Sequence, residues 1–114
     1  MVEAPRVYDA TRERRKPVPT YVTLLRWTEK GIEKVKESPK RLDAAKKTIK
    51  EMGGQFKAVY LVIGPYDLVT VVEAPDDETM TKINLALGSR GAVRTETLRA
   101  FTEDEYRKII AALP

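Results

Sequence analysis

The chain contains no cysteine and no histidine among its 114 residues. Without cysteine, neither a disulfide framework nor a thiolate site can form. Without histidine, His-ligated zinc, His-ligated haem, Ser-His-Asp triads and histidine general bases are all excluded. Any catalysis would therefore fall to carboxylates, tyrosine, lysine, arginine, serine or threonine.

Long apolar runs are also missing. The longest aliphatic and aromatic run, Val59–Ile63, is far too short to span a membrane. The N-terminal residues Met1–Pro5 show no apolar segment of the kind found in signal peptides. We therefore expect a cytoplasmic protein that does not interact with membranes.

The composition describes one soluble domain, with 42% apolar and 33% charged residues and a net charge of +4. Residues 1–18 contain prolines and the basic cluster Arg12–Lys16, and we expect them to form an N-terminal arm. The arm could be a flexible tail, or it could pack on a neighbouring subunit through Val7 and Tyr8. Its modest charge and single aromatic residue argue against a nucleic-acid partner.

The stretch from Tyr60 to Glu73 predicts a β-hairpin at the centre of the domain over residues 19–114. Two β-branched runs flank Gly64-Pro65-Tyr66-Asp67, whose residue types are those of a tight turn. Strands are expected over 21–27, 55–63, 67–73 and 92–99. Helices are expected over 29–37 and 39–52, from a cap at Asp76 to Gly88, and after a capping box at 102–105.

The order of these elements predicts an α+β, ferredoxin-like βαββαβ fold with a four-stranded antiparallel sheet and an additional C-terminal helix. Right-handed crossovers would place the first and third strands in the middle, and these are the two strands with apolar residues on both faces. Two main helices can cover only one face of such a sheet. We therefore expect a second copy to cover the other, in a dimeric α/β-barrel assembly.

Several motifs together resemble the GYD-domain family, over residues 19–114. They are Pro19-Thr-Tyr, Trp27-Thr28 with Gly31-Ile32, Ser38–Ala45, Gly64–Asp67, Glu73–Asp77 and Arg94–Phe101. The resemblance implies small bacterial proteins of dimeric α/β-barrel architecture and implies little about activity.

A second, fainter similarity is to the ligand-sensing domain of leucine-responsive regulators. It rests on the hairpin tip, the helix that follows and the segment Gly91–Thr95. That likeness implies small effectors bound between subunits, and higher oligomers. The helix-turn-helix part of those regulators has no counterpart in the first 19 residues, which lack helical periodicity.

The hairpin tip supplies the first candidate site residues, Tyr66 and Asp67. They could be purely structural, with Asp67 accepting from backbone amides, or they could contact a ligand at the rim of a subunit cleft. Arg26 and Trp27 end the first strand beside a helix start, where an anion could bind and Trp27 could form the wall of an apolar pocket. The alternative is a core tryptophan with a surface arginine.

Two further groups complete the candidates. Ser38, Lys40 and Arg41 lie where one helix stops and the next begins, and they could hold an anion or simply cap the helix. Arg94 and Glu96 share a face of the last strand and could pair across strands or across a dimer axis.

The preferred hypothesis is a homo-oligomeric module without catalysis, which binds small molecules or serves assembly. No metal or cofactor is expected, because the paired acids at Asp76-Asp77 and after Thr102 belong to helix starts. The alternative is a small cofactor-independent oxygenase or isomerase. Its cleft would hold an apolar ring against Trp27 and Tyr60, with Asp67 or Tyr66 moving protons.

Overall fold

The computed structural model describes residues 18–114, so the expected arm lies, except for Val18, outside the described residues. The chain forms β2 (Thr20–Trp27), α1 (Glu29–Glu33), the 3₁₀ helix η1 (Val35–Glu37), α2 (Ser38–Glu51), β3 (Gln55–Leu61), β4 (Leu68–Glu73), α3 (Asp77–Gly88), β5 (Val93–Ala100) and α4 (Glu103–Ala111).

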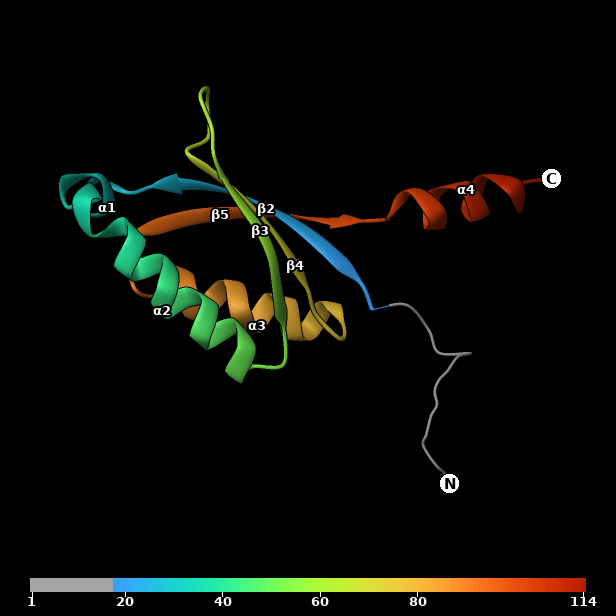
Figure 1. Ribbon diagram of the computed structural model, residues 1–114, viewed down its shortest axis with the longest axis horizontal. Helices are drawn as coiled ribbons and strands as arrows, with labels where there is room; N and C mark the ends of the chain where they lie inside the picture. Colours follow the sequence, from blue (N-terminus) through green and yellow to red (C-terminus); the bar gives the residue numbers. More distant parts are fainter. Residues whose placement is uncertain (1–17) are drawn as a thin grey trace.

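The four strands form one antiparallel sheet in the order β3-β4-β2-β5 (Figure 1). The two strands expected in the middle, β2 and β4, are the central ones. The structure therefore confirms the α+β, ferredoxin-like fold with its additional C-terminal helix.

Helices α2 and α3 cover one face of the sheet (Figure 1). The core lies between them and the alternate residues of the central strands, as the two-residue period of a strand requires. Its buried members are Tyr21, Ile49, Val72, Ala74, Met80 and Ile83, with Met52, Phe56 and Leu87 packed against them.

Local sequence signals start the helices. The Thr28 side chain accepts a hydrogen bond from the Gly31 amide, and the Asp76 side chain accepts one from the Thr79 amide. Thr102 and Glu105 form the reciprocal capping box of α4. All three helix starts lie where the cap residues predict them.

The single helix expected over 29–37 is wrong, because α1 ends at Glu33. Lys34 leaves the helical region, with φ −115° and ψ 42°, and a short 3₁₀ turn follows before α2 begins. Ser38 is also not an N-cap. It is helical, with φ −59° and ψ −35°, and no side chain caps the start of α2.

The hairpin strands are shorter than expected, because β3 ends at Leu61 rather than at residue 63 and β4 begins at Leu68. The Val62 amide already donates to the Asp67 carbonyl at 2.9 Å, which closes the turn. The tip projects beyond the sheet (Figure 1). Within residues 18–114, no helix combines the length and the apolar character needed to cross a membrane.

Candidate functional site

The sheet face opposite α2 and α3 is mostly apolar, and none of the described elements covers it. Two rows of cross-strand neighbours form its centre. The rows are Ala58, Val71, Val22 and Leu98, followed by Tyr60, Val69, Leu24 and Glu96. Tyr60 and Leu98 are 61% and 54% exposed. We call these eight residues the open face.

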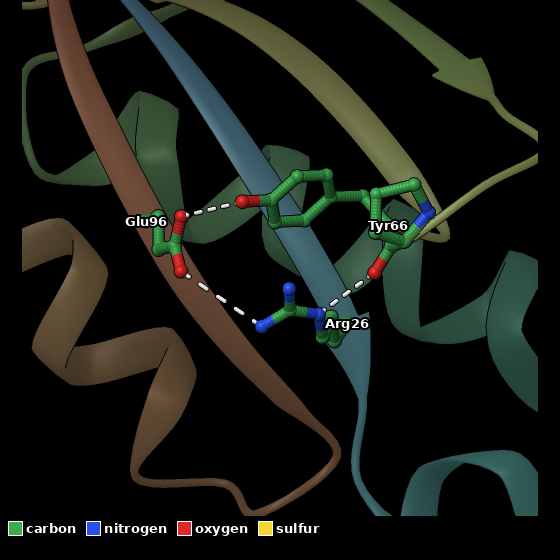
Figure 2. Close-up of polar contacts among 4 residues, drawn as sticks. Arg26, Tyr66 and Glu96 are labelled. Carbon is green, nitrogen blue, oxygen red and sulfur yellow. Dashed lines mark hydrogen bonds and ion pairs between the residues drawn. The ribbon is translucent and has the colours of Figure 1, made fainter.

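A polar cluster of Arg26, Tyr66 and Glu96 borders the open face (Figure 2). The Tyr66 hydroxyl donates to Glu96 Oε1 at 2.8 Å, and Arg26 Nη1 lies 3.8 Å from Glu96 Oε2. The Arg26 guanidinium stacks on the Tyr66 ring at 4.5 Å, and its Nε donates to the Pro65 carbonyl at 2.7 Å. These contacts fix the tip of the hairpin over β2 and β5.

The electrostatics of the cluster are set by Glu96. The hydrogen bond that Tyr66 donates to Glu96 raises the pKa of the Tyr66 hydroxyl, as do partial burial of Tyr66 and the negative charge of Glu96, while Arg26 acts in the opposite direction.

Arg94 lies directly across from Arg26 in the strand register, and among residues 18–114 it forms no ion pair. Like charges directly opposite each other on neighbouring strands are unfavourable.

Asp67 has a structural role in the turn. Its Oδ2 accepts from the Trp27 amide at 2.9 Å, and its own amide donates to the Leu25 carbonyl at 2.8 Å. The carboxylate thus joins the hairpin tip to the end of β2. This is the bonding that the structural interpretation of Asp67 predicts, although the donor amide belongs to β2 rather than to the turn.

The structure separates Trp27 from Tyr60, which the enzyme hypothesis placed around one ring. Trp27 lines a cavity of about 190 Å³ between the sheet and helices α2 and α3, whereas Tyr60 lies on the open face. Neither Tyr66 nor Asp67 lines that cavity. Within a single chain, Trp27 therefore does not share this cavity with Tyr60, Tyr66 or Asp67.

Near the start of α2, the Arg41 side chain bonds to backbone carbonyl groups. Arg41 donates to the Lys34 and Gly31 carbonyls at 3.0 and 3.1 Å, which satisfies carbonyl groups at the end of α1. Within the described residues, no cluster of three or more acidic side chains could hold a metal ion.

Two residues important to these sites were not among the sequence-derived ligand contacts. Glu96 was singled out only as a partner for Arg94, yet it accepts from Tyr66 and pairs with Arg26. Arg90 lines the cavity. Strand alternation placed Glu96 on the same face as Arg94, but nothing local marks Arg90, because its position depends on how α3 packs.

The fold places the chain in the class of small α+β domains with one helix-covered and one open sheet face. The model of the GYD domain family matches residues 21–110, and the chain belongs to this family. A relative from Thermus thermophilus, named glutamine synthetase and cystathionine beta-lyase binding protein, is 39% identical over 84 residues, which are 73% of this chain and 88% of the relative.

Solved structures confirm the fainter likeness at the level of the fold. MtbAldR superposes with a TM-score of 0.61 at 13% identity, over 86% of this chain and 63% of that protein. The leucine response regulatory protein LrpA of Mycobacterium tuberculosis superposes with a TM-score of 0.56 at 17% identity, over 88% of this chain and 65% of that protein. At these identities the likeness concerns the fold alone.

Proposed function

We propose that this chain is a non-catalytic assembly module that self-associates through its open face and holds protein partners. One observation carries the proposal: the central strands β2 and β4 are apolar on both faces, and the described helices cover only one. Removing apolar surface from water is favourable by about 25 cal/mol per Å², a gain that must exceed the entropy lost on association. A second copy is the partner that offers a matching apolar face of the same shape.

The polar border of the open face supports the same arrangement. Arg94 is exposed, and beside it Glu96 is held by Tyr66 and Arg26. In a two-fold assembly each face presents both signs of charge at its edge, so Arg94 of one copy can meet an acid of the other. Such rim pairs fix the register of an interface more than they add affinity.

The C-terminal helix α4 offers further apolar surface for the second copy. It leaves the sheet at the end of β5 and projects away from the body (Figure 1). None of its residues is buried, and Tyr106, Ile109, Ile110 and the following Leu113 are between 45% and 62% exposed. A nine-residue helix is marginal by itself in water, so a partner surface would stabilise it.

Light scattering coupled to size exclusion tests the self-association. We expect the wild-type chain to elute as a dimer or larger at micromolar concentration. Leu98→Lys and Val71→Lys, which place a charge on the open face, should shift it to monomer, as should Ile110→Lys on α4. Leu85→Lys is the control, because Leu85 is 68% exposed on α3, away from the open face. A monomeric wild-type chain would refute the proposal.

Binding of other proteins is inferred from the Thermus relative, whose name states two enzyme partners. We expect this chain to bind glutamine synthetase or cystathionine beta-lyase purified from its own organism in a sedimentation assay. A chain that self-associates but binds neither enzyme would contradict this part alone and leave the assembly module intact.

A further inference from the structure

The cavity between the sheet and the helices is a second site, separated from the open face by the thickness of the sheet. Its volume is about 190 Å³, and its walls are mainly apolar, including Leu25, Leu42, Phe56 and Leu87. An apolar cavity of about 150 Å³ is known to hold benzene in another protein. The space therefore fits a body of about one aromatic ring or a branched aliphatic chain.

The cavity wall contains a buried hydroxyl without a partner. Thr70 is only 8% exposed, and its side chain forms no hydrogen bond with any other residue between 18 and 114. The neighbouring polar side chains are satisfied, since Thr97 Oγ1 lies 2.9 Å from Thr23 Oγ1 and accepts from Asn84 at 2.7 Å. Buried polar groups normally have partners, so the Thr70 hydroxyl is available to a molecule bound in the cavity.

The charge of the cavity lining is wholly positive. Arg41 and Arg90 contribute to it, and no acidic side chain among residues 18–114 does. Both guanidinium groups are held in place, Arg41 by the Gly31 and Lys34 carbonyls and Arg90 by Thr48 Oγ1 at 2.6 Å. Because each guanidinium has five N–H donors, both keep donors for an anion.

We propose that this cavity binds a small monocarboxylic acid with an apolar body. The body would lie among the aliphatic and aromatic side chains, and the carboxylate would be held by Arg90 and Arg41. The inference is independent of the proposed assembly function, because it uses the opposite face of the sheet. Of the sequence-derived candidate residues, Trp27, Ser38 and Arg41 line this cavity, whereas those of the hairpin tip and the open face do not.

Calorimetry with 3-phenylpropionate as the probe tests the proposal, with its neutral amide as the matched compound. We expect saturable binding of the acid, and about tenfold weaker binding of the amide, because the charge-assisted hydrogen bonds are lost. Methyl NMR should place the acid in the cavity through shifts of Ile49, Val72 and Ile83 rather than of Ile109 and Ile110 on α4.

Two variants and one control separate the contribution of the arginine charge from that of the cavity volume. Arg90→Gln should weaken the acid about tenfold and leave the amide unchanged, whereas Ala45→Leu, which fills part of the cavity, should weaken both. Arg107→Gln on α4 lies outside the lining and should change neither. The proposal is overturned if the acid does not bind at millimolar concentration, if acid and amide bind equally, or if the shifts lie outside the cavity. None of these outcomes bears on the oligomeric state.

Discussion

The Tyr21 hydroxyl joins the first strand to the third helix through a hydrogen bond of 2.5 Å to Asp77 Oδ1. Burial, followed by this hydrogen bond and the negative charge of Asp77, raises the pKa of Tyr21 from 10.0 to about 12. The folded chain therefore keeps a proton that the unfolded chain releases near pH 10. The resulting stability is fully present below pH 10 and is lost as the pH rises through about 12.

Tyr21→Phe should remove this dependence. Below pH 10 we expect the variant to lose about 1 kcal/mol of unfolding free energy with the hydrogen bond. Between pH 10 and 12 the wild-type free energy should fall more steeply than that of the variant. Urea unfolding across this pH range measures both the free energy of unfolding and its slope with pH. Tyr106→Phe is the control, because Tyr106 is an exposed residue of α4. Parallel pH profiles for wild type and Tyr21→Phe would contradict the assignment.

Asp67 stabilises the junction between the hairpin tip and β2 through its hydrogen bond from the Trp27 amide. Asp67→Ala leaves the Trp27 amide without its acceptor, and we expect a loss of about 1–3 kcal/mol in chemical unfolding. Asp67→Asn keeps an oxygen acceptor and should lose distinctly less. Equal losses for the two variants would show that the hydrogen bond to Trp27 is not what the carboxylate contributes.

At the scale of elements, local sequence patterns predicted where helices begin, whereas side-chain contacts between residues distant in the sequence were not predicted. Thr28, Asp76 and Thr102 begin helices because each side chain bonds an amide three residues ahead, which the sequence displays directly. The break after α1 was not predictable in this way. It is accompanied by Arg41 reaching back ten residues to the Gly31 carbonyl, a contact that no local pattern reveals.

Local patterns also failed to predict on which sheet face every candidate site residue lies. Alternation along β2 correctly placed Arg26 and Trp27 on opposite faces, but along β3 it would place Tyr60 on the same face as Phe56. A register shift between Phe56 and Ala58 moves Tyr60 to the other face. The sequence therefore identified residues near both sites, but it could not separate the open face from the cavity.

Gly31 is the position at which α1 meets the start of β5. A Cβ there would lie 2.0 Å from the Ala92 carbonyl oxygen, which is backbone and also accepts from the Thr28 amide. Gly31→Ala should therefore cost about 2–3 kcal/mol in unfolding free energy. Gly88→Ala is the matched control: nothing lies within 4 Å of its added Cβ, so the variant should gain about 0.5–1 kcal/mol as α3 is stabilised. A tolerated Gly31→Ala would mean that α1 does not pack as described.

At the scale of the whole molecule, the two faces of the sheet divide the proposed tasks. The helix-covered face holds the core and the cavity, and the open face is the surface that we propose for assembly. Because the central strands take part in both faces, folding and association should be thermodynamically linked. The free energy of unfolding would then include a term that depends on protein concentration.

Thermal unfolding at different protein concentrations measures this linkage. If two folded copies separate as they unfold, a tenfold dilution should lower the Tm of the wild-type chain by roughly 3 °C. Leu98→Lys, a charge on the open face, should abolish the dependence and leave the Tm at its diluted value or lower. Leu85→Lys should retain the wild-type slope, because a charge on α3 does not touch the open face. A Tm that does not change with dilution in the wild-type chain would mean that the open face is stable in water without a second copy.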